Sequence, residues 1–374
     1  MSKPFVYGMS VEGENFTDRE VETKRLVLNF ENGINSILIS PRRMGKTSLV
    51  KKVKGMVESS DIKVVYMDIY QCRTEYDFYE KFASAVIQST STKMEKMLAT
   101  AKEFIMSIAP KIVYSPEPNT DFSLSLGINP RTNPPEEILS LPERIAEKRG
   151  VRMVVCIDEF QQIGEMTNSL MIQRKIRSVW QHHQHASYCL FGSKRHLMET
   201  LFYSRSMPFY QFGDMFFLKR IPTEKWVPFI IGRFQFAGKK ISEQWAEKIC
   251  QTVENYSAYV QQLAWNVLAL TEKEVTEQVF QEGMEATMSQ VIPLFVEQTA
   301  NFSTYQLNLL RAICRGYHGD FGTKEVTNQF YFGTRSNLPK LKKTLIEREI
   351  VEQTEQGLYI ADPLFQVWFS REMM

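Results

Sequence analysis

The sequence lacks the features that mark secreted, membrane-embedded or strongly charged proteins. Its five cysteines are scattered, odd in number and form no C-x-x-C pair, which favours reduced thiols in a cytoplasm over a disulfide framework or a zinc site. No run of about 18 apolar residues predicts a transmembrane helix. The N-terminus has no apolar stretch of the kind that signal peptides carry. The net charge of +2 gives no global electrostatic reason to bind nucleic acid or an acidic membrane. We therefore expect a cytoplasmic protein with no membrane partner.

The composition is that of an ordinary globular protein, because 43% of the residues are hydrophobic and 24% are charged. A chain of 374 residues is too long for one simple core, so two or three domains are expected.

Residues 34–49 carry the most specific pattern in the chain. A short apolar strand runs into a tight loop, and Gly45-Lys46-Thr47 then opens a helix. This is the context of a phosphate-binding P-loop, in which backbone N–H groups and the positive end of the helix face an anion. Lys46 would lie against the β- and γ-phosphates, and the Thr47 hydroxyl would hold Mg²⁺. The predicted nucleotide-binding residues of this loop are Ser40, Pro41, Arg42, Arg43, Met44, Gly45, Lys46, Thr47 and Ser48.

One position departs from the P-loop pattern G-x-x-x-x-G-K-[ST]. Ser40 stands where the pattern has its first glycine. The alternative is an ordinary strand–turn–helix with a chance lysine. The strand before the loop and the helix that begins after it favour the P-loop.

A continuous apolar run at residues 151–159 ends in two carboxylates, Asp158 and Glu159. Such a run predicts a central strand that is buried on both faces. In a P-loop ATPase the first carboxylate orients Mg²⁺ with its water shell, and the second polarises the attacking water. We therefore predict that Asp158 and Thr47 hold the metal and that Glu159 is catalytic. The alternative is a strand that ends in solvated acids.

Strands and helices alternate up to about residue 220, which predicts an α/β fold with a parallel sheet and helices on both faces. The predicted strands are 36–39, 63–69, 153–158, 188–192 and 215–218, and the predicted helices are 46–58, 75–89 and 169–181. An insert at 94–150 interrupts this order. Residues 94–108 predict a methionine-rich amphipathic helix, residues 111–135 hold five of the fifteen prolines, and alternation at 122–126 predicts an exposed strand or hairpin.

Two further domains are predicted after the sheet. The helical one has apolar spacing at residues 226–234, 242–254 and 259–270. The last one has helices at 303–315, 323–330 and 334–349, followed by a hairpin of residues 350–352 and 358–360. Three helices and a hairpin outline a winged helix-turn-helix. The predicted domains are therefore 1–222, 223–298 and 299–374.

Four stretches are similar to the motifs of one family. They are Phe16-Thr17-Asp18-Arg19-Glu20, the P-loop with its paired arginines, Ile157-Asp158-Glu159-Phe160-Gln161, and Asp362-Pro363-Leu364-Phe365 with Trp368. Through them the chain resembles the STAND-type AAA+ ATPases of archaea and bacteria, often called archaeal-type ATPases. The resemblance covers nearly the whole chain and is weakest over residues 94–150. It implies an AAA+ sheet with a helical lid and a winged helix, ATP or ADP with Mg²⁺ as ligands, and Arg19 in an entry motif that packs near the adenine.

The chain departs from this family at two places. The family often has Gly-x-Pro in its helical domain, where the proline approaches the nucleotide, and Asn255 and Ser257 stand there instead. Members often carry an arginine shortly after Pro-Leu-Tyr, whereas residues 208–213 read Pro-Phe-Tyr-Gln-Phe-Gly. Coupling of nucleotide state to domain movement is therefore expected to differ. The γ-phosphate-sensing arginine cannot be carried over, and Arg195 and Arg205 are candidates by proximity alone.

Two smaller signals flank the fourth strand. Ser193 stands at the sensor position of AAA+ sheets, where a polar residue can touch the attacking water or the γ-phosphate. It could equally be a helix N-cap, and both roles can hold together. His182, His183, His185 and Cys189 suggest a metal site, but no carboxylate has ligand spacing, so a solvated polar turn is favoured.

The partner of the last domain is open at this stage. Residues 334–349 would be the recognition helix of a DNA-binding winged helix, with Asn337 to read a base edge. Its cations are Arg335, Lys340, Lys342, Lys343 and Arg348. Residues 301–374 hold four Lys and five Arg against two Asp and six Glu, however, and DNA-binding modules are usually far more basic.

We therefore expect a slow ATPase that acts as a nucleotide switch or scaffold, with a protein partner or self-association. One alternative is a DNA-associated AAA+ ATPase. The other is a nucleotide-binding interaction module without useful turnover.

Overall fold

A computed structural model describes residues 3–90 and 134–374, together with residues 93, 96, 99–100, 103–104, 111–113 and 123–125 between them. The chain divides into two compact units. One unit is the continuous segment of residues 19–219. The other joins the N-terminal segment, up to residue 18, to residues 220–374. The three-domain division at 222 and 298 stays a prediction.

The continuous unit is built on a five-stranded sheet in which every pairing is parallel. The strand order is β2-β5-β6-β1-β7. The strands are β1 (Ser36–Ile39), β2 (Ile62–Asp68), β5 (Arg152–Asp158), β6 (Ala186–Gly192) and β7 (Asp214–Phe217). The strands β1 and β6 are buried at every position, as expected for central strands covered on both faces. All five predicted strands are therefore confirmed, to within two residues at each end.

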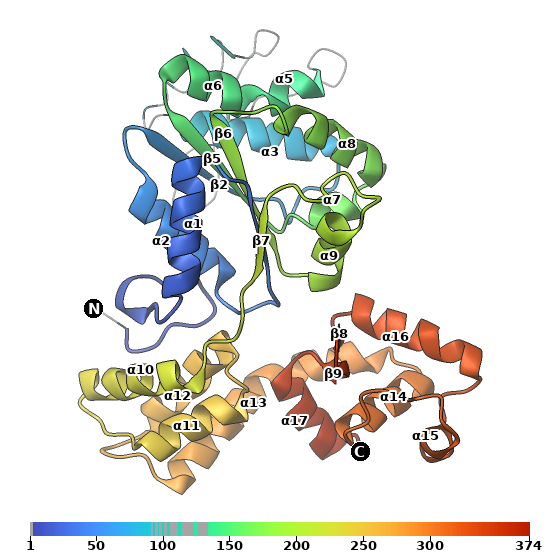
Figure 1. The fold of residues 1–374 in the computed structure, drawn as a ribbon. Helices are drawn as coiled ribbons and strands as arrows, with labels where there is room; N and C mark the ends of the chain where they lie inside the picture. Colours follow the sequence, from blue (N-terminus) through green and yellow to red (C-terminus); the bar gives the residue numbers. More distant parts are fainter. Residues whose placement is uncertain are drawn as a thin grey trace. The chain divides into compact units, whose positions relative to one another are not determined.

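Helices cover both faces of this sheet (Figure 1). The helices α1 (Glu20–Asn32) and α2 (Lys46–Val57) lie on one face. The other face is covered by α3 (Glu75–Gln88), α5 (Pro135–Leu139), α6 (Leu141–Arg149), α7 (Gln162–Glu165), α8 (Ser169–Trp180) and α9 (Arg195–Tyr203). A core of apolar side chains fills this second interface, including Ile37, Val155 and Leu190 from the sheet and Phe82 and Trp180 from the helices. The predicted α/β fold is confirmed.

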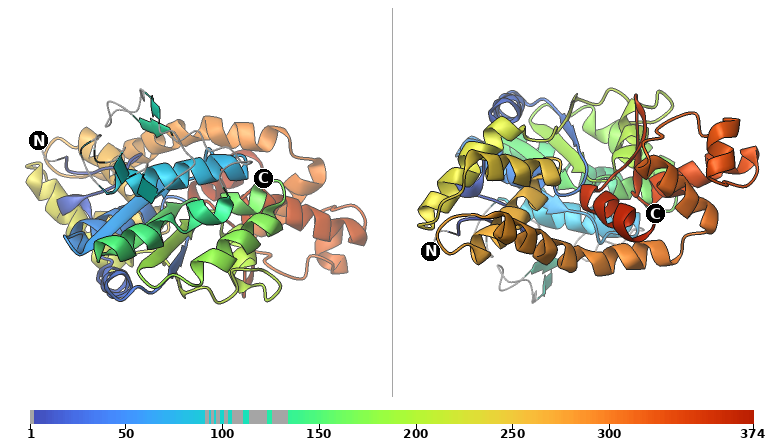
Figure 2. Two further views of the ribbon diagram at one scale, coloured as in Figure 1. Left: turned by 90° about the horizontal axis from the view of Figure 1, so that it is seen from above. Right: turned by 90° about the horizontal axis from the view of Figure 1, so that it is seen from below.

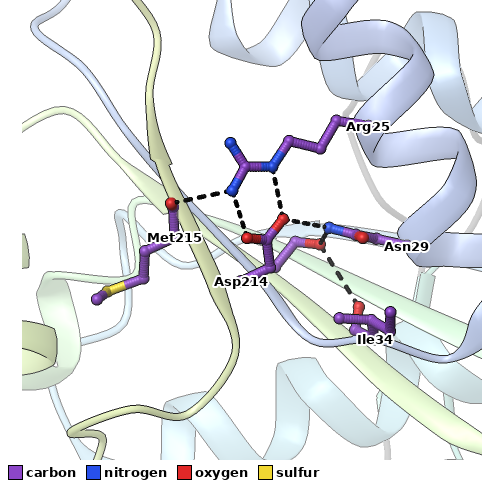
Figure 3. Close-up of polar contacts among 6 residues, drawn as sticks. Arg25, Asn29, Ile34, Asp214 and Met215 are labelled. Atoms are coloured by element: carbon purple, nitrogen blue, oxygen red, sulfur yellow. Dashed lines mark hydrogen bonds and ion pairs between the residues drawn. The ribbon is translucent and has the colours of Figure 1, made fainter.

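An ion pair ties α1 to the edge strand β7 (Figure 3). The Arg25 Nε donates to Asp214 Oδ2 at 2.7 Å, and its Nη2 donates to Asp214 Oδ1. Asn29 donates to the same carboxylate at 2.8 Å. The hydrogen bond from Arg25 lowers the pKa of Asp214. Because Asp214 is the first residue of β7, these contacts fix the start of that strand against the helix.

The insert is described only in part. Its strands β3 (Lys111–Val113) and β4 (Ser123–Ser125) pair antiparallel, so the alternation predicted at 122–126 does contain a hairpin strand. Of the helix predicted for 94–108, residues 96, 99–100 and 103–104 are described and are helical; its other residues and most of the proline-rich stretch lie outside the described residues. Within the predicted insert, α6 contacts two residues nearer its start: Arg144 donates to the carbonyl of Phe104 at 3.0 Å, and Arg149 donates to the hydroxyl of Thr100 at 2.7 Å.

The second unit begins with four helices and an N-terminal segment that packs on them (Figure 2). The helices are α10 (Thr223–Phe236), α11 (Glu243–Thr252), α12 (Ser257–Leu270) and α13 (Glu277–Ala300), and the segment contains the short η1 (Gly13–Asn15). Phe5 contacts Phe229 and Phe234 of α10. The backbone N–H of Val6 donates to the side chain of Gln261 in α12 at 3.0 Å. The first residues of the chain therefore belong structurally with its second half.

The C-terminal elements of this unit follow the predicted order. They are α14 (Thr304–Cys314), α15 (Lys324–Gln329), η2 (Arg335–Asn337), α16 (Leu338–Glu347), β8 (Val351–Thr354), β9 (Gly357–Ile360) and α17 (Pro363–Glu372). Ser303 is the N-cap of α14, as predicted, and forms a capping box with Gln306. The helix predicted for 334–349 is present but shorter, because its regular part α16 covers Leu338–Glu347 and directly follows η2. Pro339 is tolerated only in the first turn of a helix, so α16 begins at Leu338 after a separate 3₁₀ turn.

The last helix packs on the helical part of the same unit. Phe365 and Trp368 of α17 lie 5.3 and 5.7 Å, between ring centroids, from Phe295 of α13. Phe369 is fully buried beside them. The aromatic C-terminus therefore joins α17 to α13. Among the described residues, none of the helices combines the length and the apolar character needed to cross a bilayer.

Candidate nucleotide-binding site

The loop between β1 and α2 has the backbone conformation of an anion-binding turn. Arg43 and Gly45 have left-handed φ values of 65° and 89°. Gly45 directly precedes α2, whose N-terminal backbone N–H groups point into the loop. Ser40 is not among the residues with a positive φ in the described chain. The backbone therefore does not need a glycine at this position, which explains how serine can replace it.

The Lys46 side chain reaches back across this loop. Its side chain is buried, and the ammonium group donates to the carbonyls of Ser40 and Pro41, each at 2.9 Å. Met44 and Ser48 are also buried, whereas Arg42 and Arg43 are exposed. A phosphate that entered the loop would meet the ammonium group at once.

Arg19 lies against the same loop. It has a left-handed φ of 74°, is 4% exposed, and pairs with Glu22 at 3.1 Å. Its guanidinium also donates to the carbonyl of Met44 at 3.4 Å. The entry motif and the P-loop, which are 25 residues apart in sequence, are therefore in direct contact.

Asp158 receives three hydrogen bonds at the carboxyl end of β5. The Thr47 hydroxyl donates to Oδ2 at 2.8 Å, and the Tyr66 hydroxyl donates to the same oxygen at 2.9 Å. The backbone N–H of Glu159 donates to Oδ1 at 2.9 Å. Burial raises the pKa of Asp158, while the bonds from Thr47 and Tyr66 act in the opposite direction. Burial also raises the pKa of the Tyr66 phenol, so this tyrosine stays a donor.

Tyr66 was not predicted as a site residue. It lies on β2, beside β5, and Asp68 is the register partner of Asp158. Because side chains alternate along a strand, Tyr66 and Asp68 point to the same face as Asp158. That alternation identifies Tyr66 once the register between β2 and β5 is known.

Glu159 has a left-handed φ of 55° and turns its carboxylate toward the end of the neighbouring strand β6. The Ser193 hydroxyl donates to Glu159 Oε2 at 2.9 Å, and the side-chain amide of Gln161 donates to the same oxygen. The alternative N-cap role of Ser193 is wrong, since Lys194 precedes α9 and makes no side-chain cap. Gln161 stands inside the predicted acidic motif, but sequence alone gave it no role.

The carboxyl ends of β1, β5 and β6 thus bring together the loop, the two carboxylates and Ser193. Parallel strands present their carboxyl ends at one edge of the sheet, where ligands of open α/β folds bind. Two other residues singled out in the sequence make contacts within their own units. Arg195 donates to Glu199 at 2.8 Å, and Asn255 forms a side-chain hydrogen bond with Thr223 in the second unit.

The histidine cluster has structural partners. The His185 ring nitrogen Nδ1 lies 2.9 Å from Glu143, and the corresponding nitrogen of His183 lies 2.8 Å from the Tyr188 hydroxyl. Burial lowers the pKa of His183 to about 4, so its ring is neutral at physiological pH. No group of three or more His, Cys, Asp and Glu side chains suited to a metal occurs among the described residues.

The sequence matches one family model over residues 16–211, which is more than half of the chain. The description of that model is an ATPase domain predominantly from Archaea. This chain belongs to that family. The match includes the P-loop, the acidic end of β5 and Ser193, so the protein is an ATPase that binds ATP or ADP.

Solved structures have the same fold. The Walker-type ATPase PABY2304 of Pyrococcus abyssi aligns with a TM-score of 0.69 at 17% identity, covering 97% of this chain and 99% of its own. The ORC2 protein of Aeropyrum pernix, solved as ADPNP–ADP complexes, aligns with a TM-score of 0.55 at 13% identity, covering 94% and 93%. The ORC1 protein of the same organism, solved in complex with DNA, aligns with a TM-score of 0.50 at 12% identity, covering 96% and 94%.

These likenesses show an AAA+ P-loop ATPase fold. A search of the curated proteins gives no match.

Proposed function

We propose that this ATPase is a nucleotide switch of the STAND type, which binds Mg·ATP at the P-loop and hydrolyses it slowly. One contact supports the site most strongly. The Thr47 hydroxyl and the Asp158 carboxylate, 111 residues apart in sequence, are 2.8 Å apart in space. An ordinary strand–turn–helix with a chance lysine gives no reason for the threonine after that lysine to reach an acidic residue of another strand.

The residues present fit Mg²⁺. A threonine hydroxyl and a carboxylate are the hard oxygen ligands that this ion takes beside substrate phosphates. Thr47 and Asp158 would hold the ion, and a cation there would favour the ionised form of the buried Asp158 carboxyl. When bound, Mg²⁺ would neutralise charge on the β- and γ-phosphates.

Three side chains of this protein would carry out the hydrolysis. Lys46 would leave the carbonyls of Ser40 and Pro41 and bind the phosphates. Glu159 would accept a proton from the water that attacks the γ-phosphorus, and Ser193 would help to place that water. The bond between the γ-phosphorus and the β–γ bridging oxygen breaks, and ADP and phosphate leave.

We expect turnover to be slow without help from outside this chain. The stretch after Pro208 has Gln211 where the resembled family often has an arginine, and the candidate Arg195 is engaged with Glu199. An arginine supplied by a partner or a second copy would complete the site and accelerate transfer strongly. This is the reason for proposing a switch that responds to a protein partner or to self-association.

We assign residues 19–219 to the ATPase domain, and within the second unit residues 223–298 to a helical lid and 299–374 to a winged helix that serves interaction. The order of α14, α15, α16 and the β8–β9 hairpin supports the winged helix. Its cations are largely engaged within the chain. Lys342 lies 4.7 Å from the ring centroid of Phe321, Arg348 lies 5.2 Å from that of Phe302, and Lys343 is 3.8 Å from Glu347.

A second candidate function is duplex DNA binding, favoured by the likeness to an ORC1 protein solved in complex with DNA. Lys342→Glu with Lys343→Glu would then lower duplex affinity and reduce its salt dependence by roughly one unit of slope for each lost phosphate contact. If wild type binds random duplex at physiological salt more tightly than the usual non-specific Kd of roughly 10⁻⁴–10⁻⁶ M, and the double variant does not, DNA is the partner.

The decisive experiment compares Lys46→Ala with Lys52→Ala, a lysine of the same helix outside the loop. At about 100 times its Kd, Mg·ATP should stabilise wild type and Lys52→Ala by roughly 2.7 kcal/mol in thermal unfolding, and should leave Lys46→Ala unchanged. Glu159→Gln should still bind ATP but hydrolyse it at least ~100-fold more slowly, within the range of a positioned base. If Mg·ATP stabilises Lys46→Ala as much as it stabilises wild type and Lys52→Ala, the assignment of the nucleotide site is overturned. Full turnover in Glu159→Gln would remove Glu159 as the base.

A further inference from the structure

Gln161 makes a direct hydrogen bond to the carboxylate of Glu159. Its side chain is 2% exposed, and its amide nitrogen donates to Glu159 Oε2. The same oxygen accepts the hydrogen bond from Ser193 at 2.9 Å. Within the part of the chain that the structure describes, Glu159 Oε1 accepts no hydrogen bond. The two donors therefore bind one side of the carboxylate and leave the other side open.

The surroundings of Gln161 fix the direction of its amide. The carbonyl oxygen of the amide is buried and has no hydrogen-bond partner among the described residues. Burying a carbonyl oxygen without a hydrogen bond costs free energy. Because this oxygen makes no hydrogen bond, it does not hold the amide in place. The opposite orientation would bring this oxygen against the Glu159 carboxylate, where two acceptors repel. The bond to Glu159 is therefore what orients the side chain.

Gly192, the last residue of β6, provides the space for this amide. A Cβ atom at Gly192 would lie 1.9 Å from the Gln161 carbonyl oxygen and 3.0 Å from the Met198 sulfur. Gly192 has no positive φ, so its backbone does not require glycine. The absent side chain serves the close approach of Gln161 to the strand.

We propose that Gln161 is a positioning residue for the catalytic base. This rests on the proposed role of Glu159 in hydrolysis. With Ser193 it anchors Glu159 Oε2, so that Oε1 faces the attacking water and takes its proton. Without the amide, the carboxylate can rotate away from this geometry, and a small displacement of a catalytic group can lower the rate by roughly 100-fold.

The first test replaces the amide without changing the length of the side chain. Gln161→Met should lower kcat by roughly 10- to 100-fold and leave KM and the Kd for ATP unchanged, because the P-loop is intact. Gln173→Met is the matched control: Gln173 is a fully buried glutamine of α8 whose amide donates to Ser169, and its carbonyl oxygen also lacks a partner in the described chain. This control should hydrolyse ATP like wild type.

A second variant reaches the same contact from the strand. Gly192→Ala keeps every polar group but forces the Gln161 amide to move, so kcat should fall in the same way. If Gln161→Met does not fold, Gly192→Ala decides the question. Should the variants that fold and bind ATP normally turn over ATP at the wild-type rate, the positioning role is refuted.

Glu159→Gln separates this inference from the proposed function. In the Glu159→Gln background, Gln161→Met should cause no further loss, since the amide acts only through the carboxylate. If Gln161 had only a structural role, the two substitutions would lower kcat independently, and the loss in the double variant would be the product of the two single losses. If Glu159→Gln alone is slow but Gln161→Met is not, only the positioning role fails. If Glu159→Gln turns over at the wild-type rate, the proposed base fails and the inference with it.

Discussion

Removal of one hydroxyl, in Tyr66→Phe, should make nucleotide binding more sensitive to acid. Mg²⁺ needs the ionised form of Asp158, whose pKa is raised by burial. Affinity for Mg·ATP should therefore fall as the pH decreases through that pKa, at a higher pH than for an ordinary aspartate. The Tyr66 hydroxyl opposes this effect, because it donates to the ionised carboxylate at 2.9 Å. Without it, the pKa of Asp158 rises further, and the loss of affinity moves to still higher pH.

The size of the shift follows from the strength of the bond. A hydrogen bond to a charged acceptor contributes about 1.5–3 kcal/mol, and one pKa unit corresponds to about 1.36 kcal/mol. The pH at which half of the affinity for Mg·ATP is lost should therefore be roughly 1–2 units higher in Tyr66→Phe than in wild type. The ring of Tyr66 keeps its neighbour Phe191, whose centroid is 6.3 Å away, so packing changes little.

Isothermal titration of Mg·ATP across a pH series measures this midpoint. The protonation of ATP itself is common to both proteins and cancels in their difference. Tyr79→Phe is the matched control, because the Tyr79 hydroxyl also donates to a carboxylate, Glu75 at 3.2 Å, away from the nucleotide site. It should leave the midpoint unchanged. If Tyr66→Phe and wild type share one midpoint, the hydroxyl does not act on the metal ligand.

Two further predictions concern stability. Glu143 accepts the backbone N–H groups of Gln184, His185 and Ala186 at 2.8–2.9 Å, so Glu143→Ala should lower the free energy of unfolding in urea by about 2 kcal/mol or more at pH 7. Burial alone would raise the pKa of Glu143, but the hydrogen bonds lower it on balance. The unfolding free energy lost in Glu143→Ala should therefore become smaller as the pH falls below about 4. An equal loss at pH 7 and at the acidic pH would contradict this reasoning. Trp368→Ala should cost about 3–5 kcal/mol in the second unit and leave ATP affinity unchanged, as followed by urea unfolding and ATP titration; a normal urea midpoint would contradict the packing argument.

The sheet could be predicted from the sequence, and so could the residues at the carboxyl ends of its strands, because both depend on local patterns. Parallel strands covered on both faces are continuous apolar runs, and the run that ends at Asp158 is recognisable in isolation. The glycine, lysine and threonine before α2 have fixed spacing because one loop must present all of them to one phosphate chain. The same reasoning brings Ser193 to the edge, since it follows the strand beside β5.

The contacts of Tyr66 and Gln161 could not be predicted in the same way. For Tyr66 the contact depends on which strand lies beside β5 and on the register between them, which a single sequence does not specify. For Gln161 it depends on the backbone turn after β5, where Glu159 has a positive φ of 55°. The start of α16 was not predicted to the residue because the apolar spacing continues across Pro339, which fits only the first turn of an α-helix. The N-terminal segment was placed with the sheet, its neighbour in sequence, because its packing partners on α10 and α12 are more than 200 residues away.

That long separation has a consequence for how the protein is made. Synthesis proceeds from the N-terminus, and domains generally fold as they emerge. Residues 19–219 form a continuous unit and can close their core while the remaining chain is still on the ribosome. Phe5 and Val6 leave the ribosome before this unit, yet they must wait for Phe234 and Gln261 to be translated. A bulky tag fused just before these residues should therefore disturb the unit that contains residues 220–374 and spare the P-loop.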